Sequence, residues 1–226
     1  MKVSRDADPS VRRTGHWSMT CRKATSCVQR AVVFAVVAVL AGCSGIPPKV
    51  EDVTLYTLAA PPVARTVLPA YDGVLAVTPP SAWPGYDTAQ FAYARQPNEI
   101  EYYAASRWAD TPARMLGPLA TRALLESGAF RSVVAASSGL PADLRLDLEL
   151  VRLRQDFTSQ PSRIELVLHV QLVDMRNRRV VAATELSEVE GARSENATGG
   201  ASAANVALQR MLERIIVFCA TSAPPR

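Results

Sequence analysis

Hydrophobic and polar residues alternate most regularly between residues 143 and 186. In the segment from Asp143 to Phe157, one face of an extended strand carries Leu144, Leu146, Leu148 and Leu150. The other face carries Arg145, Asp147 and Glu149. From Val151 the phase shifts by one residue, which predicts a β-bulge near Leu150-Val151. The alternation resumes over 164–172 and 180–186, so the sequence predicts an antiparallel meander with one face in a core.

Shorter strands are expected in the first half of the chain. Residues 54–58 alternate weakly, and residues 73–78 form an apolar run rich in β-branched residues, which is typical of a central strand. Residues 90–96 and 99–104 flank Pro97-Asn98, a turn dipeptide, and therefore predict a hairpin.

A first amphipathic helix is expected after the hairpin. Cap residues followed by a proline, Asp110-Thr111-Pro112, mark its start, and Gly128 marks its end before a strand over 130–136. Its apolar residues recur at three- and four-residue spacing: Met115, Leu116, Leu119, Ala120, Ala123 and Leu124. Gly117-Pro118 interrupts this stripe and predicts a kink or a break.

A second amphipathic helix is expected to open at Gly199-Gly200. Its apolar stripe consists of Ala204, Leu208, Met211, Leu212, Ile215 and Cys219. Its polar face consists of Asn205, Gln209 and Glu213. The elements together predict a single α+β domain, in which two amphipathic helices pack on one face of an antiparallel β-sheet.

The N-terminal region has the pattern of an export signal. Twelve small or aliphatic residues, 31–42, follow Arg22, Lys23 and Arg30. Crossing a bilayer takes about 20 apolar residues, whereas a secretory signal needs only a short apolar core behind positive charge. The tetrad Leu40-Ala41-Gly42-Cys43 resembles the lipobox of bacterial lipoproteins, in which the cysteine sulfur receives a diacylglycerol and becomes the new N-terminus. The alternatives are a membrane-anchor helix or a leader cleaved elsewhere.

These patterns divide the chain into four parts. Residues 1–42 form the expected signal peptide, with Met19 as an alternative start of translation because Met1 to Ser18 shows no periodicity. Residues 43–53 form a lipidated tether, residues 54–220 the folded domain and residues 221–226 a loose tail. The residue after Cys43 is serine and not aspartate, which by resemblance to enterobacterial lipoproteins fits export to the outer membrane.

The charge balance changes once the leader is set aside. Seven of the 25 Lys and Arg and two of the 21 Asp and Glu lie in residues 1–42, which leaves 18 basic and 19 acidic residues. A near-neutral domain lacks the concentrated basic face that nucleic-acid binding requires. Removal of the leader and lipidation of Cys43 would leave Cys219 as one thiol, which we expect to pack as a small hydrophobe.

The sequence offers little for catalysis. His169 is the one histidine after the leader, on the polar face of its strand, where a half-exposed structural histidine is the expectation. Asp147 and Glu149 have the spacing of an acid/base pair, but Arg145 beside them favours an ordinary solvated strand face. Gly199-Gly200 is too little for a nucleotide site, and one histidine with one thiol does not make a metal site. We therefore expect neither an enzyme nor a bound cofactor or metal.

Four aromatic residues in and after the hairpin are candidates for binding a partner: Tyr93, Tyr102, Tyr103 and Trp108. Tyrosine and tryptophan often anchor protein interfaces. The alternative is that they pack between the hairpin and the first helix.

The order of these features resembles the ABC-type transport auxiliary lipoprotein family, which includes the paraquat-inducible protein C-like lipoproteins. The resemblance covers roughly residues 40–186. It rests, after the lipobox, on Tyr56-Thr57-Leu58, the strand GVLAVTPP from Gly73, Phe91-Ala92-Tyr93, Glu101-Tyr102-Tyr103, Trp108, Pro112, and the helix exit at Leu124, Ser127, Gly128 and Phe130.

The resemblance implies a non-enzymatic component of a mammalian-cell-entry (MCE) type lipid transporter. Such a lipoprotein, held at the outer membrane and facing the periplasm, docks an MCE protein and through it an ABC ATPase and permease, in some members as a ring-like homo-oligomer. The residues leave two alternatives open. One is a stand-alone lipid carrier with a cavity between sheet and helices, and the other is a periplasmic hydrolase dependent on His169.

Overall fold

The longest strands of the protein form an antiparallel meander along one side of its sheet. A computed structural model describes residues 52–65 and 71–224. In it β7 (Leu144–Asp156), β8 (Arg163–Asp174) and β9 (Arg179–Gly191) pair in sequence along nearly their whole lengths. The register between β7 and β8 shifts between Leu150 and Arg152, which confirms the predicted bulge. The leucines of β7 are buried on both sides of that bulge.

Six shorter strands complete the sheet among the described residues. They are β1 (Thr54–Tyr56), β2 (Tyr71–Val77), β3 (Ser81–Ala82), β4 (Gln90–Ala94) and β5 (Glu101–Trp108), with β6 (Phe130–Ala135) at one edge. The β4–β5 hairpin is antiparallel, as predicted. A short 3₁₀ helix, η1 (Ala136–Ser138), links β6 to β7.

The sheet is mixed, which corrects the prediction of an antiparallel sheet. β2, β3 and β4 run beside β7 in the same direction, and their registers place Leu75 opposite Leu144, Ser81 opposite Glu149 and Tyr93 opposite Gln155. β6 is parallel to β2, and β1 is parallel to β5. The chain leaves β7 between these short pairings at Pro79-Pro80, because proline cannot donate to a strand ladder.

The first helix, α2 (Pro112–Ser127), begins and ends where the sequence predicts. The Thr111 hydroxyl accepts a hydrogen bond from the Arg114 N–H, and Gly128 takes the left-handed conformation, φ 70°, that a helix C-terminus favours. The predicted break at Gly117-Pro118 does not occur, since the helix is continuous through Pro118. Gly117 packs against the Pro80 ring, so the small residue serves close contact with the β2–β3 connection.

The last helix, α3 (Ala197–Ser222), starts earlier and ends later than predicted. Its N-cap is Asn196, whose side chain accepts the Gly199 N–H, and Thr221 and Ser222 belong to the helix although the sequence placed them in a loose tail. Gly199 and Gly200 lie within the first turn. Glycine is needed at both positions because a Cβ would overlap Ser194 at position 199 and Gln155 at position 200. The predicted apolar stripe of α3 is buried throughout.

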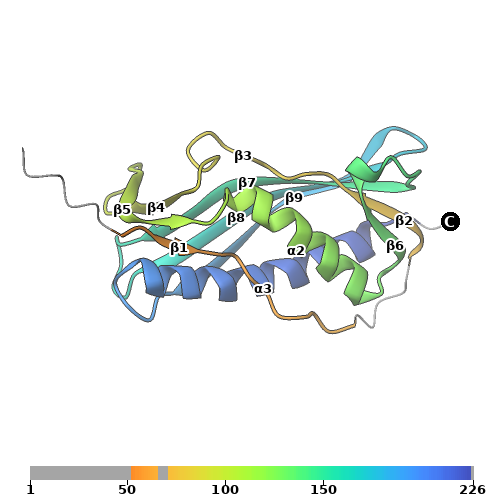
Figure 1. Ribbon diagram of the computed structural model, residues 1–226. Helices are drawn as coiled ribbons and strands as arrows, with labels where there is room; N and C mark the ends of the chain where they lie inside the picture. Colours follow the sequence, from red (N-terminus) through yellow and green to blue (C-terminus); the bar gives the residue numbers. More distant parts are fainter. Residues whose placement is uncertain (1–51, 66–70, 225–226) are drawn as a thin grey trace, which may run out of the picture. The chain divides into compact units, whose positions relative to one another are not determined.

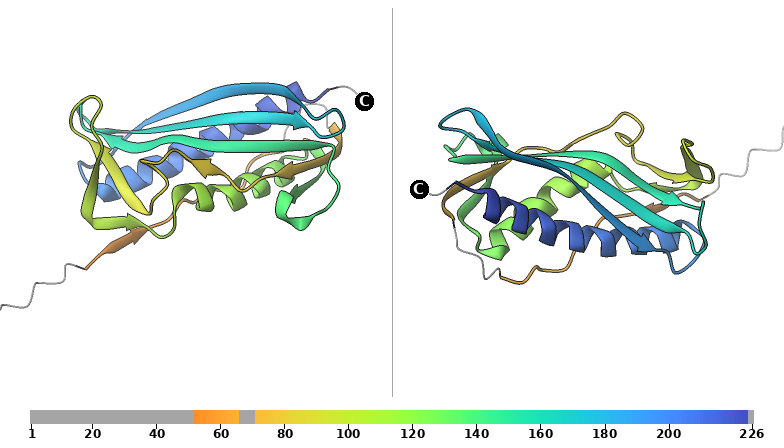
Figure 2. Two further views of the ribbon diagram at one scale, coloured as in Figure 1. Left: turned by 90° about the horizontal axis from the view of Figure 1, so that it is seen from above. Right: turned by 180° about the vertical axis from the view of Figure 1, so that it is seen from behind.

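Both helices cover the same face of the curved sheet (Figures 1 and 2). α3 packs on β8 and β9, α2 packs on β6, and the two helices contact each other. This confirms two amphipathic helices on one face of an α+β domain. The chain divides into two units, Met1–Val50 and Glu51–Arg226, and this architecture describes the second.

Candidate functional site

The aromatic residues of the hairpin form a packed cluster at one end of the sheet. Trp108, which is 2% exposed, stacks on Phe91 with ring centroids 4.4 Å apart, and Tyr103 meets Phe91 edge-on at 5.4 Å. The Tyr56 hydroxyl lies 2.9 Å from the Thr198 hydroxyl in the first turn of α3. The cluster therefore packs against the start of the last helix, whereas the sequence had suggested the first helix.

Two of the four predicted partner-binding residues pack in the core or against it. Trp108 is enclosed by its neighbours and presents almost no surface. Tyr103 is half-buried, and its hydroxyl donates to the Gln155 side-chain oxygen at 2.9 Å. Gln155 is itself fully buried and donates to the Ser162 hydroxyl at 2.8 Å. Burial raises the pKa of Tyr103, so this phenol remains a neutral donor.

The other two residues, Tyr93 and Tyr102, are partly exposed. The Tyr93 hydroxyl donates to Glu101 at 3.0 Å across the hairpin. The Tyr102 hydroxyl donates to the Gly85 carbonyl at 3.0 Å and so fastens the loop after β3 onto the hairpin. Both tyrosines position neighbouring segments, and part of each ring remains available at the surface.

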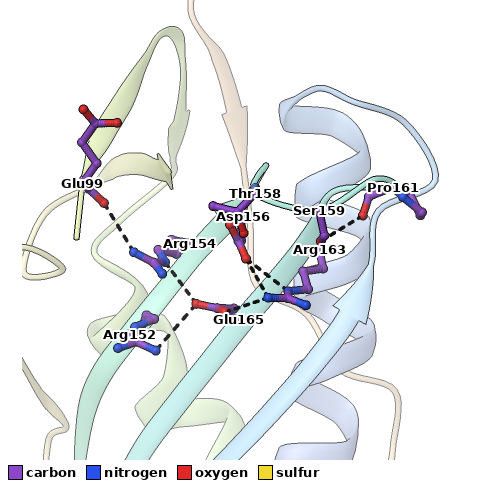
Figure 3. A network of polar contacts seen from close by, with 9 residues as sticks. All are labelled: Glu99, Arg152, Arg154, Asp156, Thr158, Ser159, Pro161, Arg163 and Glu165. Carbon is purple, nitrogen blue, oxygen red and sulfur yellow. Dashed lines mark hydrogen bonds and ion pairs between the residues drawn. The ribbon is translucent and has the colours of Figure 1, made fainter. Parts of the chain in front are cut away.

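A hydrogen bond joins the turn of this hairpin to a network of ion pairs on β7 and β8 (Figure 3). Arg154 donates to Glu165 at 3.1 Å and to the Glu99 carbonyl at 3.4 Å, while Arg163 lies 2.9 Å from Asp156. Asp156 is nearly buried, and although burial opposes its ionisation, the Thr158 backbone and Arg163 lower its pKa. The guanidinium groups here are thus engaged by carboxylates and a carbonyl from neighbouring strands.

A groove on the outer side of α2 has a volume of about 600 Å³. We call it the α2 groove. Its lining is mostly apolar and comes from three rigid segments, the β2–β3 connection, α2 and the β6–η1 junction: Val77, Thr78, Pro79, Pro80, Arg114, Gly117, Pro118, Thr121, Arg122, Leu125, Ala135 and Ser137. Leu125 is 54% exposed there. Sequence reasoning missed this surface, although Pro79-Pro80 and Gly117-Pro118, which line it, were visible as interruptions.

The space between the sheet and the two helices is filled. The cavity there has a volume of about 10 Å³ and is lined mainly by leucines, among them Leu116, Leu150 and Leu208. This volume is close to that needed for one water molecule, whereas small-molecule sites occupy about 300–1,000 Å³. This cavity, between the described parts of the sheet and the helices, therefore has no room for an acyl chain.

The residues considered for catalysis pair with neighbouring strand residues. His169 is half-buried, and its register partners are Glu149 and Glu185. Asp147 pairs with Arg145 at 2.8 Å and accepts a hydrogen bond from the Thr78 hydroxyl at 2.9 Å. Asn196 caps α3. Within residues 52–65 and 71–224 there is no group of three or more His, Cys, Asp or Glu that could hold a metal ion.

The proposed lipid-attachment residue Cys43 and the lipobox residues Leu40, Ala41 and Gly42 lie outside the described residues. The part of the chain that the structure describes contains no helix with the length and apolarity of a membrane span.

The fold has counterparts among solved structures. A protein of the DUF330 family from Xanthomonas campestris is similar with a TM-score of 0.70 and 21% identity, over 75% of this chain and 95% of that one. An uncharacterized protein gives a TM-score of 0.56 at 11% identity, over 70% of this chain and 99% of the other. At these identities the likeness shows the fold.

The family follows from a second comparison. The model of the ABC-type transport auxiliary lipoprotein component family matches residues 56–216, more than half of the chain, and the chain therefore belongs to that family. No curated protein matches the chain. The expectation drawn from the ordered motifs of the hairpin and first helix is thus confirmed at the level of the family.

Proposed function

We propose that the protein is an outer-membrane-anchored accessory lipoprotein of an MCE-type ABC lipid transport system, which binds the periplasmic MCE component and is not an enzyme. The family match over residues 56–216 is the observation that carries this proposal. The lipobox tetrad at 40–43 supplies the anchor. Two or more acyl chains hold a protein firmly on a membrane without any spanning helix.

The α2 groove is the surface that we assign to the MCE component. Its walls come from a strand connection, a helix and a 3₁₀ junction, and the helix packs on the core, so the groove is at least partly preorganised. Leu125 and the flanking prolines offer apolar contact area, which a protein segment with apolar anchor residues would cover. Docking of this kind needs shape and apolar area and no reactive group.

The filled interior favours docking over the stand-alone carrier. A carrier requires a cavity that encloses its lipid, and the space between the sheet and the helices is about 10 Å³. Native mass spectrometry of the delipidated protein separates the two functions. A tightly held phospholipid would support the carrier, and its absence from a protein that still binds the MCE component would support docking.

Site-specific photo-crosslinking in cells tests the docking surface. A photoreactive residue at Leu125 should give an adduct with an MCE-domain protein, identified by mass spectrometry. Val217 on α3 is 50% exposed and lies outside the groove, so it is the matched control and should give no such adduct. Adducts at both positions, or at neither while the lipoprotein is folded and membrane-bound, would overturn the assignment.

Anchoring has its own test. Radiolabelled palmitate should be incorporated into the protein, and Cys43→Ser should abolish both the label and recovery in the outer-membrane fraction. An unlabelled protein that fractionates as before would overturn the lipid anchor.

A further inference from the structure

Two exposed apolar side chains, Trp83 and Ile100, form a surface that we call the apolar tip. Trp83 is 51% exposed and Ile100 is 40% exposed. The Trp83 N–H donates to the Leu150 carbonyl at 2.9 Å, and Tyr102 holds Gly85 at 3.0 Å. Gly85 packs so closely on Ile100 that a Cβ there would lie 3.3 Å from the isoleucine Cδ1. The loop and the hairpin are therefore one rigid unit, and the exposure of both side chains is built into it.

The apolar tip lies at the end of the domain where the folded chain begins. Thr54, the first residue of β1, pairs with Ser106, and Glu101 at the start of β5 precedes Ser106 by five residues. Because β5 bulges there, Arg107 lies opposite Gln90 and Glu101 opposite Tyr93, only three residues apart on β4, so Glu101 lies at most about 10 Å past the start of β1. The views agree that the β4–β5 hairpin and the start of β1 share one end, with the end of α3 at the other (Figures 1 and 2).

The tether limits how far this end can move from a bilayer. Eight residues lie between Cys43 and Asp52, the first described residue, and the nine Cα–Cα steps between them span at most about 30 Å when fully extended. A lipid at Cys43 therefore keeps the start of β1 within that distance of the membrane, and the hairpin projects from the same end. Tryptophan is also enriched in proteins at the interfacial layer of a bilayer.

We propose that the apolar tip inserts into the interfacial layer of the membrane that holds the Cys43 lipid, and so fixes the orientation of the domain. This inference rests on the proposed lipid anchor. Insertion does not depend on anionic headgroups, because the arginines near the tip are paired, Arg95 with Glu101 and Arg154 with Glu165. The orientation directs the opposite end of β7 and α3 away from the bilayer.

Tryptophan fluorescence of the processed, lipidated protein in phosphatidylcholine vesicles tests this inference. Residues 43–226 contain two tryptophans, Trp83 and the buried Trp108. Brominated acyl chains should quench part of the emission, and Trp83→Phe should remove the quenching. Replacing part of the phosphatidylcholine with phosphatidylglycerol should change the quenching by less than twofold.

A relocated tryptophan provides the control. Leu140 is 60% exposed and precedes β7, whose far end, at Asp156, pairs with the hairpin residue Ala94. Trp83 itself bonds to Leu150, six residues beyond the first residue of β7, so about 20 Å of strand separates Trp83 from the start of β7. Leu140→Trp in the Trp83→Phe background should show no quenching. Vesicle-bound protein with unquenched Trp83, or with quenching equal at both positions, overturns the insertion alone.

A separate outcome identifies failure of the anchor. Protein that carries no lipid and leaves the vesicles overturns the proposed anchoring and this inference with it. If Trp83 becomes inaccessible only when the MCE component is added, the apolar tip is a protein contact and the insertion is overturned.

Discussion

The indole ring of Trp108 lies stacked on the phenyl ring of Phe91, with the centroids 4.4 Å apart and the planes inclined by 29°. Both side chains are almost completely buried. This pair joins the end of β5 to β4, and the first turn of α3 packs against it. The aromatic richness of the hairpin is therefore first a matter of stability.

Trp108→Ala should destabilise the domain by about 3–5 kcal/mol, the usual cost of removing a buried aromatic side chain. The free energy of unfolding, from urea titration followed by circular dichroism, measures the effect. Trp83→Ala removes the same side chain from an exposed position and should cost less than about 1 kcal/mol. Equal stability of Trp108→Ala and wild type would contradict the structural role of Trp108 and leave partner binding as its interpretation.

Gly200 should resist substitution because of the side chain that it faces. A Cβ at position 200 would overlap the side-chain oxygen of Gln155 and lie 3.1 Å from the Phe91 ring. Gln155 is held by Tyr103 and Ser162 and cannot move without breaking hydrogen bonds. Gly200→Ala should therefore lose about 1–3 kcal/mol of stability, measured by thermal or urea unfolding.

Gly191 is the matched control for that substitution. A Cβ there would meet nothing within 4 Å. Gly191→Ala should change stability by no more than about 0.5 kcal/mol, and a loss equal to that of Gly200→Ala would contradict the steric explanation.

Glu188 should give the protein part of its sensitivity to acid. Burial opposes ionisation of this carboxyl, but hydrogen bonds from Arg214 and Arg210 outweigh it and lower the pKa below the ordinary value of 4.5. A lowered folded-state pKa stabilises the protein above the unfolded pKa, and that stability is lost as pH falls through the folded value. Unfolding free energies between pH 7 and pH 3 should fall less steeply for Glu188→Gln than for wild type.

The control for Glu188 lies on α3, the helix that carries Arg210 and Arg214. Glu213 is exposed on α3, and Glu213→Gln should keep the wild-type acid profile. Identical profiles for wild type and Glu188→Gln would show that the arginines do not act through this carboxyl.

Cys219 should be inert in the native protein. Burial raises the pKa of its thiol to about 12, so the thiolate that reacts with maleimides and disulfide reagents is scarce at pH 8. Labelling followed by mass spectrometry should be negligible in buffer and complete in concentrated urea. Rapid labelling of the folded protein would show that the C-terminal half of α3 opens locally.

The regular elements of this fold could be predicted because their signals are local. The alternation in β7 and β8, the phase shift at Leu150-Val151 and the apolar stripe of α3 each follow from residues close in sequence. The parallel pairings of β2, β3 and β4 with β7 could not be predicted, since two to seven residues carry little periodicity and their partner lies far along the chain.

The surfaces were harder to predict than the core. Trp108 and Trp83 look alike in sequence, and only the tertiary structure shows that one is buried and the other exposed. The α2 groove arises where three distant segments meet, so its residues share no motif. The helix cap at Asn196, by contrast, could have been predicted from the sequence, because asparagine is common at the position before a helix.

The one-directional course of β2, β3 and β4 beside β7 has a consequence for biogenesis. Each of these early strands pairs with β7, which is synthesised at least 50 residues later. A polypeptide that enters a translocation channel N-terminus first would keep these segments unpaired until β7 had followed them through. If the proposed signal peptide directs export, this late pairing would keep the chain unfolded during translocation and confine assembly of the sheet to the far side of the membrane.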